Sequence, residues 1–308
     1  MRVVVTGATG MLGRPLVRAL VARGDRVVAL TRDPDRARAA LGGGDAVEAV
    51  EAALECAGPW QARLADADAV VHLAGEPLAA HRWNARVRQA IRDSRVESTV
   101  ALVDGLAAAP PDARPKVLVS ASGADIYEAA APGDDFDFDE GQDAGDTFLA
   151  RLCVEWEAAA AAAAPLGVRV VRMRTGVVLG PGGALDRMRT PFKLLVGGRL
   201  GSGRQWLSWI HVDDAVAGYL AALDDDRLVG PVNLVAPSAA TAGDLARAVG
   251  KALHRPAWLP VPGFALRAAV GELADYLLAG RKVVPRALER IDFTFRHPQL
   301  DEAVAASF

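Results

Sequence analysis

The stretch "VVVTGATGMLGRPLV", residues 3–17, places three glycines between a β-branched run and an apolar segment of helical period. Gly7 allows a tight turn, Gly10 lets backbone N–H groups approach a diphosphate, and Gly13 lets a helix pack closely on a strand. The first turn of the helix adds unpaired N–H donors and the positive end of its dipole. The stretch therefore predicts a dinucleotide-binding strand–turn–helix unit; the simpler interpretation is a glycine-rich turn without a ligand.

The rest of the chain alternates strand-like and helix-like segments. Strands are predicted at residues 2–7, 25–32, 67–75, 115–122, 168–183 and 230–237, with a short strand from Trp206. Helices are predicted at residues 11–24, 82–109 and 146–167, in the second half of 206–225, and two or three times after Thr241. The acidic, glycine-containing stretch from Gly123 to Gly145 is predicted to be a surface loop. This order predicts an α/β fold: a doubly wound parallel sheet, Rossmann-like, with a smaller, mainly C-terminal substrate lobe.

The end of the second predicted strand discriminates between two dinucleotides. A carboxylate there would bind the ribose hydroxyls of NAD, but this chain has Thr31 and Arg32, with Asp33 one place later. A guanidinium can bind a 2'-phosphate through paired hydrogen bonds, so NADP(H) is favoured as the cofactor. The alternative is a solvated Arg32 paired with Asp33.

A second turn, "HLAG" at residues 72–75, ends the strand that faces the same cofactor. The predicted cofactor-binding residues are Thr6, Gly7, Thr9, Gly10, Met11, Leu12, Gly13, Thr31, Arg32, Leu73, Ala74 and Gly75. Asp66 and Asp68 could reach the adenine, although turn residues are the simpler interpretation. Residues 1–175 and 206–236 are assigned to the NADP-binding domain, and residues 176–205 and 237–308 to the smaller lobe.

Composition excludes several other classes of function. The formal net charge of -3 over 308 residues, with arginines interspersed among acids, gives no reason to expect nucleic-acid binding. The two cysteines, Cys56 and Cys153, lie far apart, and the five histidines lack ligand spacing, so no metal site is predicted. No membrane span or signal peptide is recognised, which predicts a cytoplasmic protein without a membrane partner.

The spacing T-G-x-x-G-x-x-G resembles that of the extended, sugar-epimerase-like branch of the short-chain dehydrogenase/reductase superfamily. That resemblance implies a tyrosine acid/base, a lysine four residues later that lowers its pKa, and a serine that orients the substrate oxygen. Ser122 matches the serine. If Glu157 aligns with the acidic position after the lysine, Leu149 and Cys153 stand at the tyrosine and lysine places. Tyr127 could have taken over proton transfer, or it is an aromatic residue in a loop over the cofactor.

Longer segments resemble an atypical family of that superfamily, the epimerase-family proteins with a C-terminal domain of unknown function. The matching segments are "VVHLAGEP", "RW" with "RDSRVEST", "LVSAS", "GDTFLARLCVEWEAAA", "RTGVVLGPGGAL", "GGRLGSGRQWLSWIHVDD", "GPVNLVAP" and "PAWLPVPGFALRAAVGELA". They follow one another over nearly the whole chain. The resemblance implies an NADP(H)-binding fold with a poorly defined activity. The chain departs from the family at "SASGADIYE", where one tyrosine and a closing glycine are replaced.

Two groups of residues are candidates for substrate contacts. Glu76, Arg82 and Trp83 follow the strand end that faces the cofactor, and Arg204 and Trp206 follow a pliable glycine turn. Arg88, Arg92 and Arg95 share one helical face, which is either solvated and balanced by nearby acids or part of an anion pocket.

Two functions remain open. The first is an NADP(H)-dependent oxidoreductase or epimerase-like enzyme acting on an unknown small, polar or anionic molecule, with Ser122, Glu76 and Tyr127 as catalytic candidates. Glu76 or an ordered water would then donate the proton. The second is a non-catalytic NADPH sensor that presents a surface to a partner, as the missing tyrosine and lysine would suggest. A homodimer is also predicted as a possible assembly.

Overall fold

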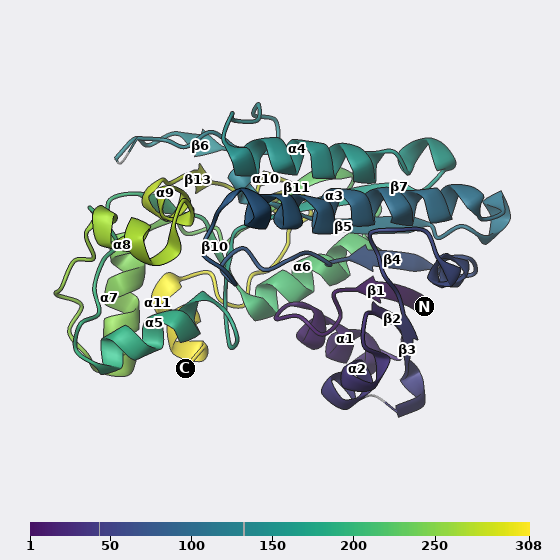
Figure 1. Ribbon diagram of the computed structural model, residues 1–308, viewed down its shortest axis with the longest axis horizontal. Coiled ribbons are helices and arrows are strands. Elements are labelled where there is room, and N and C mark those ends of the chain that lie inside the picture. The colour runs from purple at the N-terminus through teal and green to yellow at the C-terminus, as the bar shows by residue number, and fades with distance from the viewer. Residues whose placement is uncertain (43, 132) are drawn as a thin grey trace.

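A seven-stranded parallel sheet forms the centre of the computed structural model, which describes residues 1–42, 44–131 and 133–308 (Figure 1). Its strands, in spatial order, are β11 (Gly230–Leu234), β7 (Arg169–Thr175), β5 (Val117–Gly123), β4 (Ala69–His72), β1 (Arg2–Thr6), β2 (Arg26–Thr31) and β3 (Val47–Glu51). On one side of the sheet β1 is followed by β2 and β3, and on the other side β4 is followed by β5, β7 and β11. A crevice at the carboxyl edge of the sheet is expected where the order reverses.

Helices cover both faces of this sheet, because its strands alternate buried side chains between two cores. Val3 and Val5 pack in the core that includes α1 (Gly13–Ala22), α2 (Pro34–Leu41) and α6 (Val212–Asp224). Val4 packs in the opposite core, beneath α3 (Ala85–Ala108) and α4 (Phe148–Ala161). Burial on both faces explains the near-continuous apolar strands. The predicted doubly wound α/β fold is confirmed.

A smaller lobe lies at one end of the sheet (Figure 1). Its helices are α5 (Ala184–Lys193), α7 (Ala242–Leu253), α8 (Gly263–Val270), α9 (Leu273–Leu278) and α11 (Leu300–Ala306). Helix α10 (Arg286–Glu289) lies beside β11 of the central sheet. Two-stranded pairs connect the smaller lobe to the sheet: β8 (Val177–Leu179) with β10 (Trp209–His211), β9 (Trp206–Leu207) with β12 (Ala240–Thr241), and β6 (Asp137–Phe138) with β13 (Lys282–Val283).

The C-terminal third differs in detail from the sequence prediction. Five helices follow Thr241 in place of two or three: Gly271 separates α8 from α9, and the short helix α10 begins after Pro285. After Pro285 the chain returns to the sheet, where Ala287 and Leu288 pack in the same core as β11. The two predicted parts of the chain therefore share one core along this segment, and the division into domains stays a prediction.

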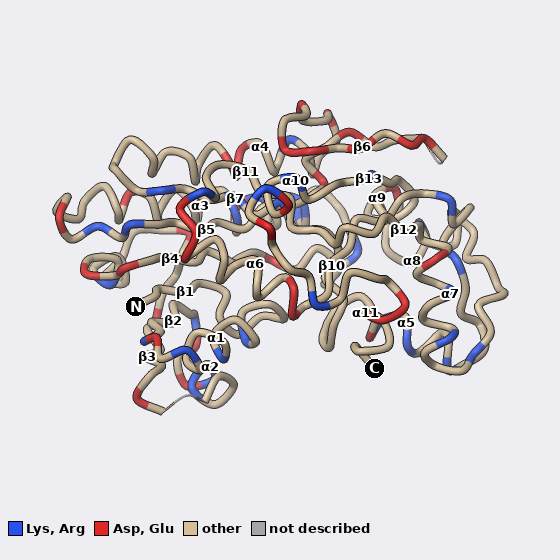
Figure 2. Tube along the Cα trace, turned by 180° about the vertical axis from the view of Figure 1, so that it is seen from behind, with Lys and Arg blue, Asp and Glu red and all other residues tan. Residues whose placement is uncertain are grey.

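The predicted acidic loop from Gly123 to Gly145 contains one short strand, β6, which pairs with β13 of the lobe. Lys282 on β13 forms ion pairs with Asp135 and Asp137, so charge as well as backbone pairing fixes the loop. Figure 2 shows acidic residues concentrated along this segment. Pro132 belongs to the predicted loop but lies outside the described residues.

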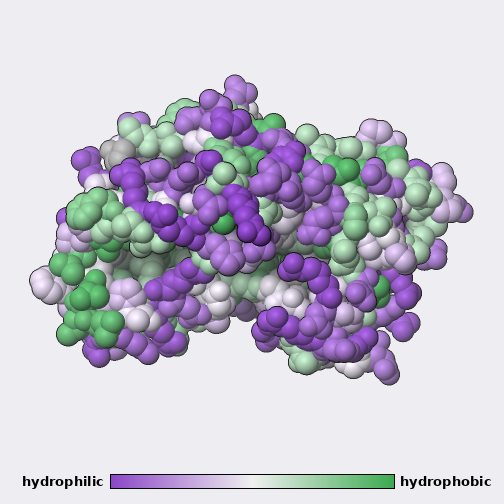
Figure 3. Space-filling view, viewed as in Figure 1, coloured by the Kyte–Doolittle hydropathy of each residue, from purple (hydrophilic) through white to green (hydrophobic). Residues whose placement is uncertain are grey.

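The remaining surface carries charges of both signs, interspersed over both lobes (Figure 2). Hydrophobic side chains gather at the far end of the smaller lobe (Figure 3). The exposed large ones on this lobe include Leu194, Leu195, Val196, Trp258, Leu259 and Phe264. Among the described residues, no helix combines the length and apolar character needed to cross a membrane.

Candidate functional site

The glycine turn after β1 is closed so tightly that side chains are excluded. Gly7 has a φ of +66°, and a β-carbon there would lie 2.7 Å from the backbone carbon of Leu73. A β-carbon on Gly13 would lie 2.2 Å from the carbonyl oxygen of Gly7, so α1 packs directly against the turn. Gly10 donates its N–H to the same carbonyl at 3.0 Å. The turn therefore leaves open the backbone surface at the start of α1 that a diphosphate requires.

Thr6 holds the glycine turn against the second turn, which follows β4. Its hydroxyl lies 2.7 Å from Nδ1 of His72 and accepts the N–H groups of Leu73 and Ala74, each at 3.1 Å. Nε2 of His72 lies 3.3 Å from the hydroxyl of Ser98 on α3. Complete burial lowers the pKa of His72 to about 4, so the imidazole is neutral. Thr6 consequently joins two strand ends and does not line the cavity described next.

A cavity of about 530 Å³ opens at the carboxyl edge of the sheet. The predicted residues that line it are Gly7, Gly10, Met11, Leu12, Gly13, Leu73, Gly75, Ser122 and Trp206. Thr9 and Ala74 border it without lining it. Thr31 and the exposed Arg32 lie at the end of β2, beside the glycine turn. Asp33 caps α2 by accepting the N–H of Arg36, and no ion pair joins it to Arg32 among the described residues.

Ser122 lies in the cavity wall, and its hydroxyl proton is already used in a hydrogen bond. It donates to Oε1 of Glu157 at 2.8 Å, and both side chains are buried. Glu157 is held in turn by two hydrogen bonds from Arg174, at 2.8 and 3.0 Å. Because the proton points at a carboxylate, the free lone pairs of Ser122 can accept a hydrogen bond from a substrate hydroxyl.

Tyr127 belongs to the same buried network and not to the cavity wall. Its hydroxyl donates to Oδ1 of Asn233 at 2.7 Å and accepts from Arg174 at 2.9 Å. The side chain is fully buried, which raises the pKa of Tyr127 to about 12. Because its hydroxyl both donates and accepts within this network, Tyr127 has no free proton to give to a substrate, which contradicts the predicted role in proton transfer. Its burial outside the cavity wall also contradicts the alternative prediction of a loop aromatic over the cofactor.

Helix α4 presents to the cavity the two residues that stand at the expected tyrosine and lysine places. Leu149 and Cys153 both line it, together with Leu152 and Trp156 from the same helix. Burial raises the pKa of the Cys153 thiol to about 12, so it remains protonated at neutral pH. This wall of the cavity is apolar where the superfamily has its acid/base pair.

Three residues in the cavity wall were not among the predicted site residues. Arg281 and Tyr276 come from the C-terminal lobe, and Asp125 follows β5. Arg281 donates to Oδ1 of Asp125 at 2.9 Å and to the backbone carbonyl of Tyr127. Its Nη2 is buried and has no hydrogen-bond partner among the described residues. Arg281 and Tyr276 could not be found from the sequence, because only the fold brings the lobe to the strand ends; Asp125 lies three residues after Ser122.

Arg95 is the one helix arginine that reaches the cavity. Its guanidinium lies 5.3 Å from the ring of Trp156 and donates to the carbonyl of Glu76 at 3.0 Å. Arg88 forms an ion pair with Glu272, and Arg92 forms one with Glu155. These two arginines therefore fit the interpretation of a solvated helix face balanced by nearby acids. Only one of the three arginines therefore supports the anion-pocket alternative.

Of the four predicted substrate residues, the structure places one in the cavity wall and three outside it. Trp206 lines the cavity, and its indole N–H donates to the carbonyl of Asp134. Arg82 and Arg204 are exposed and lie outside the cavity wall, as does the side chain of Glu76. Trp83 is 2 % exposed and packs edge-on against Phe148, so it is a core residue. An apolar aromatic beside a strand end looks the same in sequence whether it is packed or open.

The fold and the cavity together define a dinucleotide-binding protein of the doubly wound class. Residues 3–234 match the NAD dependent epimerase/dehydratase family, and the chain belongs to that family. Residues 261–307 match a domain of unknown function, DUF1731. The predicted resemblance to epimerase-family proteins with such a C-terminal domain is confirmed.

Relatives cover essentially the whole chain. It is 40 % identical over 307 residues to the chloroplastic epimerase family protein SDR39U1 homolog of Arabidopsis thaliana, covering 99 % of this chain and 86 % of the relative. The crystal structure of human epimerase family protein SDR39U1 with NADPH superposes with a TM-score of 0.86 at 34 % identity, covering 100 % and 99 % of the two chains. UDP-glucuronic acid 4-epimerase from Bacillus cereus with NAD, at 17 % identity, a TM-score of 0.77 and coverage of 100 % and 95 %, shares the fold.

Proposed function

We propose that this chain binds NADP(H) and uses it as an oxidoreductase or epimerase-like enzyme on a small anionic substrate. The observation that carries the proposal is the cavity itself, which runs from the glycine turn at one end to Ser122 and Arg281 at the other. NADP(H) is supported by the side-chain-free cradle at Gly7 and Gly13, by Arg32 beside it, and by the human relative solved with NADPH.

A bound NADP(H) would supply hydride exchange with a carbonyl or alcohol carbon. Residues of the cavity wall would orient the substrate, donate the proton and exclude water. Ser122 would accept a hydrogen bond from the substrate hydroxyl, since Glu157 holds its proton. Tyr276, the lobe tyrosine in the cavity wall, is the candidate proton donor in place of the missing residue on α4. Leu149 and Leu152 would keep water from this part of the cavity.

An anionic substrate is supported by the two arginines in the cavity wall. Arg281 has a buried Nη2 without a partner among the described residues, although Asp125 balances part of its charge. Arg95 adds a second guanidinium from the opposite lobe. Burying a guanidinium donor without a partner is costly, and a carboxylate or phosphate would satisfy it.

The test is a screen in which NADPH oxidation is followed with pairs of carbonyl compounds, one carrying a carboxylate and one its neutral amide. We expect turnover with the carboxylate member and at least about tenfold less with the amide. Ser122→Ala and Tyr276→Phe should each lower kcat/KM by about a hundredfold, while Ser307→Ala, near the C-terminus, leaves it unchanged. Equal rates in Ser122→Ala and the unmodified chain would reject the role of Ser122.

A second function is favoured by one observation, the apolar Leu149 and the protonated Cys153 where an acid/base pair stands in the superfamily. These residues fit a chain that binds NADPH without turnover and signals the bound state to a partner. NADPH binding with no oxidation across the whole screen would select this function over the enzyme.

A further inference from the structure

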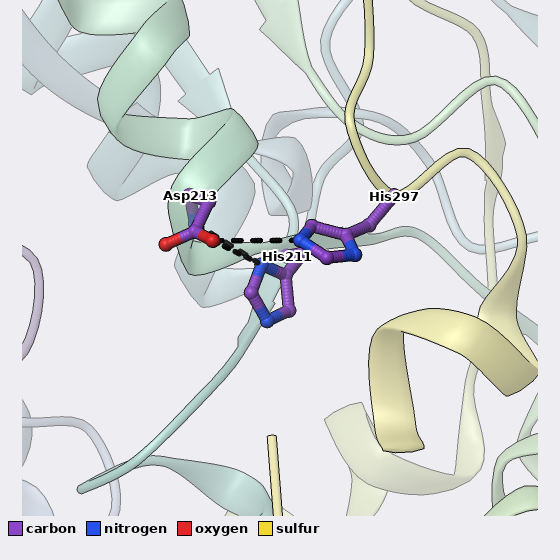
Figure 4. A group of neighbouring side chains, drawn as sticks. All are labelled: His211, Asp213 and His297. Atoms are coloured by element: carbon purple, nitrogen blue, oxygen red, sulfur yellow. Dashed lines mark hydrogen bonds and ion pairs between the residues drawn. The ribbon is translucent and has the colours of Figure 1, made fainter. Parts of the chain in front are cut away.

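Two histidines and an aspartate meet where the smaller lobe returns to the sheet, away from the cavity wall (Figure 4). His211 ends β10, Asp213 lies in the first turn of α6, and His297 precedes α11. Figure 4 shows Nδ1 of His211 and Nε2 of His297 both directed toward the Asp213 carboxylate. Sequence spacing gave no sign of this group, because His297 is 84 residues from Asp213.

The separations between the potential ligand atoms are close to those around one cation. Oδ2 of Asp213 lies 3.8 Å from Nδ1 of His211 and 3.4 Å from Nε2 of His297, and all three atoms lie within 4.8 Å of one another. Ligands bonded at about 2.0–2.1 Å in a tetrahedral site are separated by about 3.4 Å. A small movement of one imidazole would complete three corners of a tetrahedron.

The surroundings hold the ligands in place. Asp214 is buried and accepts the backbone N–H groups of Arg296 and His297 at 2.6 and 2.9 Å, which fixes the backbone carrying the second imidazole. His211 is 3 % exposed, so packing limits the movement of its imidazole, although its buried Nε2 has no hydrogen-bond partner among the described residues. The side chain of Asp213 is 45 % exposed, so a cation could enter from solvent and keep a water as its fourth ligand.

Two contacts oppose a cation at this position. Nδ1 of His211 accepts the N–H of Asp213 at 3.2 Å, and this helix cap would be exchanged for the metal bond. The exposed guanidinium of Arg296 lies 3.6 Å from Oδ2 of Asp213 and competes for the same carboxylate. Both contacts are available to the metal-free protein, so the site does not need a metal for the chain to fold.

We propose that His211, Asp213 and His297 form a binding site for a borderline-soft divalent cation of the zinc class, which ties the lobe to the start of α6. Two imidazole nitrogens and one carboxylate are ligands that suit Zn²⁺, Co²⁺ or Ni²⁺, whereas Mg²⁺ and Ca²⁺ prefer oxygen ligands alone. The proposal is independent of the substrate and of turnover.

The test uses the full chain without a histidine tag, stripped with a chelator and titrated with ZnCl₂ by calorimetry. We expect one Zn²⁺ per chain, no comparable binding of Mg²⁺, and a visible absorption band on titration with Co²⁺. His297→Ala and Asp213→Asn should each weaken Zn²⁺ binding by at least about tenfold, because they remove ligands. His254→Asn, which removes an exposed histidine at a left-handed position, is the matched control and should bind as the unmodified chain does.

Arg296→Ala separates a metal site from a plain ion pair. Removing the competing guanidinium should strengthen Zn²⁺ binding severalfold, whereas in a purely structural ion pair it would only loosen the segment before α11. Far-UV circular dichroism and the unfolding midpoint in chelator establish that each variant is folded. The proposal is overturned by an absence of Zn²⁺ binding, by equal affinity in His297→Ala and Asp213→Asn, or by equal affinity for Mg²⁺.

Discussion

The two ends of the cavity differ in how closely they follow the family. At the glycine turn every constraint is met: Gly7, Gly10 and Gly13 are where backbone must approach backbone or ligand. At the other end Leu149 and Cys153 replace the acid/base pair, and Arg281 and Tyr276 from the lobe stand nearby. The residues of the glycine turn therefore match the superfamily pattern, whereas the residues at the expected acid/base positions do not.

The largest effect is expected from Gly13→Ala, which disrupts the glycine-turn end of the cavity. Its β-carbon would lie 2.2 Å from the carbonyl oxygen of Gly7, so the turn must move. We expect a loss of about 2–3 kcal/mol in the free energy of unfolding. NADPH affinity, measured by calorimetry, should fall by about a hundredfold or more. Gly141→Ala, in the acidic loop, serves as the control; undiminished affinity in Gly13→Ala would contradict the assigned role of the turn.

A second effect, which develops only as the pH falls, is expected from the buried histidine that supports the same end. The folded state holds the pKa of His72 at about 4, below its usual 6.5, so the unfolded chain binds the proton more tightly. Its contribution to stability is complete above pH 6.5 and is lost as the pH falls toward 4, by about 3 kcal/mol in all. Urea unfolding at a series of pH values measures this loss.

The difference between two variants isolates the contribution of His72. His72→Asn should show a flatter dependence of unfolding free energy on pH between 6.5 and 4, while His81→Asn, at an exposed position, should follow the unmodified chain. Parallel curves for His72→Asn and the unmodified chain would show that His72 is not held neutral.

The smallest effect is expected from Arg32→Ala, which sharpens the choice of cofactor. The exposed guanidinium beside the glycine turn would meet a 2'-phosphate, and its removal should reduce the preference for NADPH over NADH by about tenfold. Affinities for both dinucleotides are compared with those of Arg18→Ala, an exposed arginine on α1. An unchanged ratio would mean that Arg32 takes no part in selection.

The sequence could predict those features of the site that depend on residues close together in the chain. The glycine turn, the strand ends at Ser122 and Leu73, and the replacement of the tyrosine and lysine all follow from positions close together in the chain. Arg281 and Tyr276 could not be found in this way, because they lie 120 and 115 residues beyond the end of α4 at Ala161, and the lobe must fold back before they meet the cavity. The same holds for His297, whose partner His211 lies on another element.

The burial of individual side chains could not be predicted from the sequence pattern either. Trp83 and Tyr127 follow strand ends, as functional residues do, yet both are enclosed by side chains from distant segments. Arg95 shares a helical face with Arg88 and Arg92, and only the packing of Trp156 against it separates the three. Identity and spacing locate such residues, whereas their environment comes from the tertiary fold.

The clamp of Arg174 on Glu157 has a consequence for protein engineering. Grafting a tyrosine at position 149 and a lysine at position 153 would restore the superfamily's residues but not their surroundings. The hydroxyl of Ser122 would still donate its proton to the Glu157 carboxylate, which is paired with Arg174. A variant meant to free the Ser122 hydroxyl would therefore have to remove the Arg174–Glu157 ion pair as well as change positions 149 and 153.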